Sequence, residues 1–177
     1  MSPPQLERRR RGGVSGAAGE AAGPEGLRVR AVLLASENRR IPPAAIDLAA
    51  DIAKRSGAPV HVFSIARIWG TSFGFPNPGL FPSRQEWEEQ RENAGRAVAR
   101  LERRGVAAKA RVIGTRAGAK RIVKEAERLG CDAIVMGADP PAGALVRNFM
   151  WGQEPYRVRR RARRARIPVF LVVDDSS

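Results

Sequence analysis

From residue 28 onward, short apolar runs alternate with longer stretches in which apolar residues recur at helical spacing. This alternation limits the fold more than any other feature of the sequence. The apolar runs cover 29–35, 60–66, 106–113, 133–136 and 169–173. Runs of this length are typical of strands, whereas apolar residues at every third or fourth position are typical of helices. Strands that are joined through helices run parallel, with right-handed connections. The pattern therefore predicts an α/β fold: a doubly wound, five-stranded parallel sheet with helices on both faces.

Start and stop signals for helices stand between these runs. Helices are expected over 42–57, 83–105, 115–130 and 153–166. Ser83, followed three residues later by Glu86, is the pattern of a capping box. Thr115 is the expected cap of the third helix. In the fourth, Val158, Ala162 and Ala165 are expected to face the sheet.

The first 27 residues have a different composition, with three prolines and six glycines and no periodic apolar pattern. We expect a disordered tail over 1–27 and a single domain over 28–174. No apolar run approaches the roughly 20 residues of a membrane span. No apolar segment follows the arginines at 8–11, as a secretory signal would require. The expected location is therefore cytoplasmic, away from membranes.

The sequence is poor in residues that carry catalysis or bind metals. Cys131 is the only cysteine and His61 the only histidine. A disulfide within the chain is therefore excluded, and zinc sites and Ser/His/Asp catalysis lack their residues. No general base or nucleophile is recognisable, so we expect no enzyme and no metal cofactor. A hydrolase or transferase acting on nucleotides is the least favoured alternative.

The net charge of +14 is concentrated near the C-terminus. The cluster consists of Arg157, Arg159, Arg160, Arg161, Arg163, Arg164 and Arg166. Such a cluster attracts polyanions, which makes non-specific nucleic-acid binding through this helix one hypothesis. The other is structural: arginine is a good helix former, and positive charge near a helix C-terminus is stabilised by the helix dipole.

Three stretches resemble the universal stress protein family. Residues 131–137 read Cys-Asp-Ala-Ile-Val-Met-Gly, residues 167–173 read Ile-Pro-Val-Phe-Leu-Val-Val, and residues 49–58 read Ala-Ala-Asp-Ile-Ala-Lys-Arg-Ser-Gly-Ala. The resemblance implies strand order 3-2-1-4-5, counting the expected strands along the chain. It also implies a stress-associated regulatory or ligand-sensing role and, in many members, bound ATP or AMP. Family members usually form homodimers through the last strand. Here that strand would be 169–173, an apolar edge that invites pairing.

The phosphate-binding motif of the family, Gly-x2-Gly-x9-Gly-Ser/Thr, is only partly matched. Gly137 fits its first position, but Pro140 stands at the second and has no N–H to offer a phosphate. Gly152 comes two residues late, and Gln153 replaces the hydroxyl residue. The family's aspartate after the first strand is also missing, with Glu37 the nearest carboxylate. We therefore expect adenine-nucleotide binding to be weak or absent.

In a doubly wound sheet, ligands bind beyond the carboxyl ends of the strands, where the strand order reverses. The candidate cofactor-binding residues are those at this switch point, together with the partly matched motif positions. They are Ala35, Ser36, Ser64, Ile65, Gly137, Ala138, Asp139, Gly152 and Gln153. Two features remain open. The aromatic stretch 67–82 is either a lid or a packed loop, and the apolar residues 149–151 either fill the pocket or form an oligomer surface.

Overall fold

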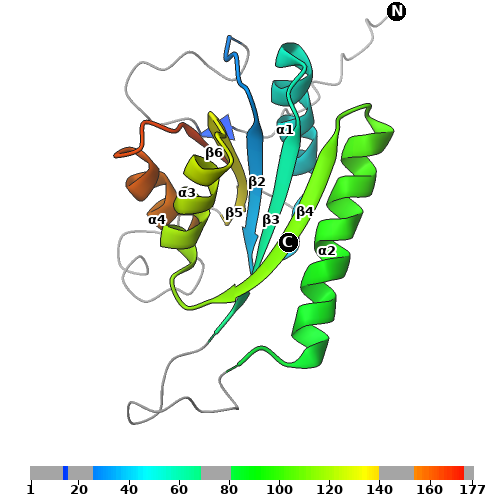
Figure 1. Ribbon diagram of the computed structural model, residues 1–177, viewed down its shortest axis with the longest axis vertical. Helices are drawn as coiled ribbons and strands as arrows, with labels where there is room; N and C mark the ends of the chain where they lie inside the picture. Colours follow the sequence, from blue (N-terminus) through cyan, green and yellow to red (C-terminus); the bar gives the residue numbers. More distant parts are fainter. Residues whose placement is uncertain (1–13, 16–25, 69–80, 140–153, 174–177) are drawn as a thin grey trace, which may run out of the picture.

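The computed structural model describes residues 14–15, 26–68, 81–139 and 154–173 (Figure 1). Within these ranges the chain forms six strands and four helices. In chain order they are β1 (Val14–Ser15), β2 (Val32–Glu37), α1 (Pro43–Ser56), β3 (Val60–Arg67), α2 (Arg84–Arg103), β4 (Ala108–Thr115), α3 (Gly118–Arg128), β5 (Ala133–Ala138), α4 (Glu154–Ala162) and β6 (Val169–Val173).

The strands form one sheet in the order β1-β6-β5-β2-β3-β4. The five strands β2 to β6 are parallel, and they follow the order 3-2-1-4-5 that the sequence predicts. The expected fold class is therefore confirmed. β1 is an addition that the sequence did not reveal. It lies antiparallel to β6 at the edge of the sheet, with Val14 opposite Val172 and Ser15 opposite Leu171.

The helices cover both faces of the sheet, α1 and α2 on one side and α3 and α4 on the other (Figure 1). Every residue of β2 and β5 is buried, as expected for central strands covered on both faces. Adjacent residues of a strand point to opposite faces, so Leu34 packs in the core beneath α1 and α2 while Leu33 packs beneath α3 and α4. Each pair of helices is thus fixed on the sheet by its own hydrophobic core.

The expected capping box of α2 is present. The Glu86 amide donates to Ser83 Oγ at 3.1 Å, and the Ser83 amide donates to Glu86 Oε2 at 2.6 Å. The expected cap of α3 is wrong. Thr115 Oγ1 accepts from the amide of Ala117 at 3.2 Å, ahead of the helix, and α3 begins only at Gly118. The start of α3 therefore lacks a side-chain cap from its own segment.

α4 is shorter than its pattern predicts, because Ala162 is its last residue. Arg166 has a positive φ of 55°, a conformation that cannot continue a right-handed helix. Arg163, Arg164 and Arg166 therefore lie beyond the helix rather than in its last turn. The expectation that the helix dipole stabilises these three charges within the last turn of the helix is not met. Of the three positions expected to face the sheet, Val158 and Ala162 are fully buried, and Ala165, beyond the end of the helix, is partly buried against the same core.

Candidate anion-binding site

The structure brings the candidate residues of β2, β3 and β5 together at the carboxyl end of the sheet. Ser36 lies opposite Ser64 in the β2–β3 ladder, and Gly137 and Ala138 end the adjacent β5. Ala35, Ser36, Ser64, Ile65 and Ala138 are all buried, each with 4% or less of its surface exposed. Gly152 and Gln153 lie outside the described residues, as does most of the aromatic stretch 67–82.

The polar groups of these residues are already used within the protein. Ser36 Oγ donates to the carbonyl of Arg39 at 2.5 Å, and Ser64 Oγ donates to Gln90 Oε1 at 2.7 Å. Gly137 is packed against the ring of Pro42. A Cβ atom added to Gly137 would lie only 2.6 Å from two carbons of that ring. These candidates therefore form the carboxyl end of the sheet and offer few free hydrogen-bonding groups to a ligand.

An ion pair connects the ends of β2 and β5 across the switch point. The guanidinium of Arg39 binds both carboxylate oxygens of Asp139, at 2.7 and 3.2 Å. The hydroxyl of Tyr156 in α4 donates to the carbonyl of Asp139 at 2.9 Å. Asp139 is the one exposed candidate among those described. It is held in place by Arg39, which follows β2, and by Tyr156 of α4.

A pocket of about 590 Å³ lies beside this end of the sheet, between the end of β3, the start of α3 and one side of α4. We call it the cationic pocket, because its lining is dominated by arginine and lysine. It is lined by Arg67, Arg116, Ala117, Gly118, Ala119, Lys120, Glu154, Arg157, Arg160, Arg161 and Arg164. The volume is within the range of small-molecule sites, roughly 300–1,000 Å³. Such a lining favours an anionic ligand.

Glu154, the first residue of α4, holds the start of α3. Its Oε1 accepts a hydrogen bond of 2.6 Å from the amide of Ala119. Its Oε2 lies 3.8 Å from the guanidinium of Arg157, one turn further along α4, and only 13% of the side chain is exposed. The first amides of a helix lack partners within the helix and favour a negative group. Glu154 supplies that group from another element.

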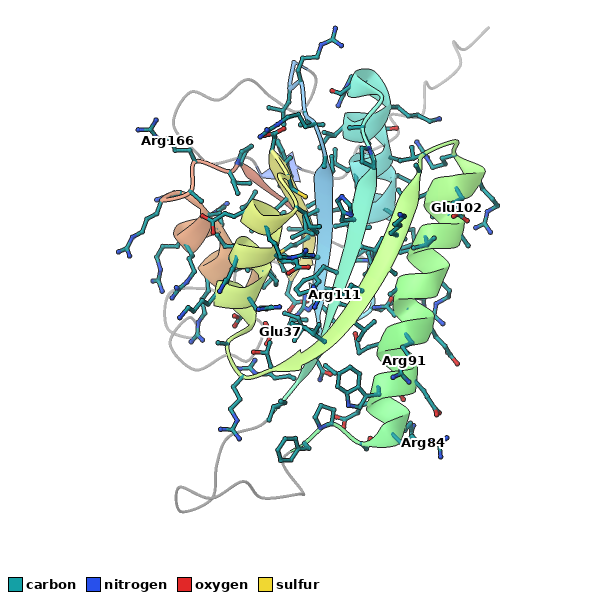
Figure 2. All side chains as sticks on the ribbon, viewed as in Figure 1. Glu37, Arg84, Arg91, Glu102, Arg111 and Arg166 are labelled. Atoms are coloured by element: carbon teal, nitrogen blue, oxygen red, sulfur yellow. The ribbon has the colours of Figure 1, made fainter. Side chains whose placement is uncertain are left out.

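Glu37, the last residue of β2, is a second carboxyl at this place. Figure 2 shows it at the end of the sheet where α3 begins. Its side chain is 4% exposed, and Arg67 Nε lies 3.7 Å from Oε1. The ionised Glu37 receives no hydrogen bond, whereas the protonated form can donate to the neighbouring carboxylate of Glu154. It presses against Gly118, where a Cβ would overlap the carboxylate. Burial, and next the charge of Glu154, raise the pKa of the Glu37 carboxyl to about 7, against the opposing effect of Arg67.

The sequence identified part of this site. It singled out the arginine cluster, of which Arg157, Arg160, Arg161 and Arg164 line the pocket. It named Glu37 only as the nearest carboxylate to a missing aspartate. It did not reveal the contribution of Gly118 and Ala119, because the cap that they need comes from a residue 35 positions away. Their one local signal was the glycine at the start of α3.

Metal-binding clusters and membrane spans are both absent from the described part of the chain. No group of three or more histidine, cysteine, aspartate or glutamate side chains is placed to hold a metal ion there. None of the helices described is both long and apolar enough to span a bilayer.

Comparison with known proteins gives a consistent result. The sequence model of the universal stress protein family matches residues 28–172. A structure of a protein from this family from Burkholderia pseudomallei shares 24% identity with the chain, with a TM-score of 0.57, over 82% of this chain and 96% of that one. No curated protein sequence matches the chain.

Two similar structures carry ligands. The universal stress protein from Archaeoglobus fulgidus in complex with dAMP shares 19% identity, over 80% of this chain and 95% of that one, with a TM-score of 0.55. A universal stress protein in complex with cAMP shares 21% identity, over 83% of this chain and 98% of that one, with a TM-score of 0.52. At these identities the likeness supports the fold.

Proposed function

Because the chain belongs to the universal stress protein family, we propose that it is a non-enzymatic ligand-sensing domain that binds a phosphorylated ligand in the cationic pocket. Adenine nucleotides are the first candidates. The observation that carries the proposal is the pocket itself. Seven arginine and lysine side chains and the start of a helix surround a space of about 590 Å³ at the carboxyl end of the sheet.

Two observations support a phosphate-bearing ligand. Both ligands in the complexes above, dAMP and cAMP, carry a phosphate group. In this chain Pro140 cannot donate an amide to a phosphate, so the glycine loop is a weaker phosphate site than in the family motif. Guanidinium groups replace that function well, because each presents several N–H donors in a planar fork that matches phosphate oxygens.

The affinity is expected to depend on phosphate charge more than on the base. Ser36 and Ser64 at the carboxyl end of the sheet are already hydrogen-bonded within the protein, and none of the described residues that line the pocket is aromatic. We therefore expect ATP to bind more tightly than ADP, and ADP more tightly than AMP. Binding should weaken as salt is raised, since salt screens the exposed part of the interaction.

Calorimetric titration of the purified chain with ATP, ADP and AMP, at about 50 and 200 mM salt, tests this order. Replacing Arg157 and Arg161 by glutamine should remove most of the binding. The same replacement of Arg84 and Arg96, which are exposed on α2, should leave it unchanged. Absence of heat with all three nucleotides, or AMP binding as tightly as ATP, contradicts the proposal. Release of inorganic phosphate in proportion to protein contradicts its non-enzymatic part.

Nucleic-acid binding is the second candidate. Arg157, Arg160 and Arg161 are exposed on one side of α4, with Arg164 just beyond its end, and all four line the pocket. A row of guanidinium groups of this kind fits a phosphate backbone without reading its sequence.

A further inference from the structure

We infer that Glu154 is a built-in competitor of the ligand: its carboxylate occupies the place at the start of α3 that a phosphate of the ligand takes on binding. The inference rests on the proposed function for the class of ligand. It goes further in assigning the position of one phosphate and the residue that must leave it.

The start of α3 needs a negative group that its own segment does not provide. The residue before this helix, Ala117, has no side-chain acceptor, and the carboxylate of Glu154 binds the amide of Ala119 instead. A carboxylate in this position imitates a phosphate, since both place charged oxygens on the free amides of a helix start. Arg67, Arg116, Lys120 and Arg157 line the same pocket, so an arriving phosphate would meet positive charge beside those amides.

Glu37 is a buried neighbour that responds to whichever anion stands in the place of Glu154. Its carboxyl group presses against Gly118, is almost fully buried and receives no hydrogen bond when it is ionised. When it carries its proton, it can share that proton with the carboxylate of Glu154. A phosphate has more oxygens than a carboxylate. It could accept from the amides of α3 and also from Glu37 when that carboxyl group carries its proton.

The side chain of Glu154 has another partner to which it can turn. Its second oxygen already lies 3.8 Å from Arg157 on the same helix. Rotation of the side chain would exchange the amide of Ala119 for a closer pair with this arginine, a pairing that helical spacing of three residues allows. Its removal from the amides requires no movement of either helix. The Glu154 carboxylate would therefore move to Arg157 while a phosphate of the ligand takes its place at the start of α3, within one pocket.

The test uses the full chain and inorganic pyrophosphate as the probe, with Glu154→Ala and Glu154→Gln compared with the wild type. Glu127→Ala is the matched control, because Glu127 is exposed on the far part of α3 and its loss changes the net charge equally. We expect Glu154→Ala to bind pyrophosphate about tenfold more tightly than Glu127→Ala, since the ligand no longer displaces a charge-assisted hydrogen bond. Glu154→Gln should be intermediate.

Thermal unfolding provides the second readout. Without ligand, Glu154→Ala should melt about 2–4 °C below the wild type, because α3 has lost its cap. Saturating pyrophosphate should raise its midpoint more than that of the wild type. If Glu154→Ala does not fold, Glu154→Gln, which keeps an acceptor for the amide, decides the question against Glu127→Gln.

The possible failures are distinguishable. Equal or weaker pyrophosphate binding by the Glu154 variants than by the Glu127 controls overturns the inference, even if the wild type binds ATP. A wild type that binds no nucleotide, together with a Glu154→Ala variant that binds pyrophosphate, overturns the proposed function of the natural chain and leaves the inference intact. A loss of stability without a gain in affinity makes Glu154 a cap only, which also overturns the inference.

Discussion

Glu37 brings a buried carboxyl group to the end of β2, and its ionisation links the stability of the fold to pH. Its pKa is about 7 in the folded protein, compared with 4.5 for an unperturbed glutamate. Between these values the folded chain binds more protons than the unfolded chain, so this residue lowers the free energy of unfolding as the pH rises. Its stabilising protonated form is fully present below pH 4.5 and lost above pH 7.

Glu37→Gln should therefore stabilise the protein at high pH only. At pH 8 we expect its free energy of unfolding to exceed that of the wild type by up to about 3 kcal/mol, because a glutamine needs no proton to remain neutral. The difference should shrink toward zero near pH 4.5. Urea unfolding at about pH 5 and pH 8 measures it.

The comparison between variants isolates Glu37 from other carboxyl groups. Asp47, Glu125 and Asp132 have pKa values lowered by their arginine partners, and they affect both proteins equally at low pH. Glu127→Gln on the exposed side of α3 controls for the change in charge. A Glu37→Gln variant with the same pH dependence as this control would show that the buried carboxyl group is not the source.

At the scale of elements, β1 covers part of the β6 edge through which the sequence predicts a dimer. The sequence predicts a homodimer through 169–173, whereas in the structure β1 pairs with Leu171 and Val172 of the same strand. The open side of an edge strand can pair with only one partner at a time. A second copy of the chain that paired with β6 would therefore have to displace β1 from this edge.

Weakening β1 should increase the fraction of dimer. Val14→Pro and Ser15→Pro each remove a backbone donor without shortening the chain, and deletion of residues 1–25 removes the segment entirely. Sedimentation velocity over a range of protein concentrations should show tighter self-association in these variants than in the full-length wild type. A monomer mass for all of them at high concentration would mean that β6 does not form a dimer. Equal dimerisation in all would mean that β1 does not compete.

Elements with a local signal could be predicted from the sequence, and those that depend on distant residues could not. The apolar runs located β2 to β6, and the Ser83–Glu86 pair located the start of α2. The start of α3 was misplaced because the hydroxyl of Thr115 bonds ahead of the helix, while the actual cap comes from α4. β1 has only two residues and no apolar run. The cationic pocket, likewise, exists only once α3 and α4 lie side by side.

At the scale of the whole molecule, positive charge is distributed unevenly. α2 contains five arginines and five glutamates, and neighbours such as Arg84 and Glu88 pair along the helix. The arginines at 157–166 have a single glutamate near them in the sequence, Glu154, which is bound to α3. A polyanion should therefore be attracted to the side of the molecule that carries the cationic pocket rather than to α2.

This asymmetry gives a test of nucleic-acid binding that separates local charge from net charge. Replacing Arg160, Arg161 and Arg164 by glutamine removes three charges from the pocket; replacing Arg84, Arg96 and Arg103 removes three from α2. If the arginine cluster binds duplex DNA of random sequence, only the pocket variant should lose affinity. The slope of log affinity against log salt should then fall by roughly 3, about 0.9 for each phosphate that is no longer neutralised.

Pyrophosphate should displace the DNA from the wild type, since both need the same guanidinium groups. Equal losses in the two variants would show that DNA responds only to net charge, and no binding by the wild type at about 50 mM salt would remove nucleic acid as a partner.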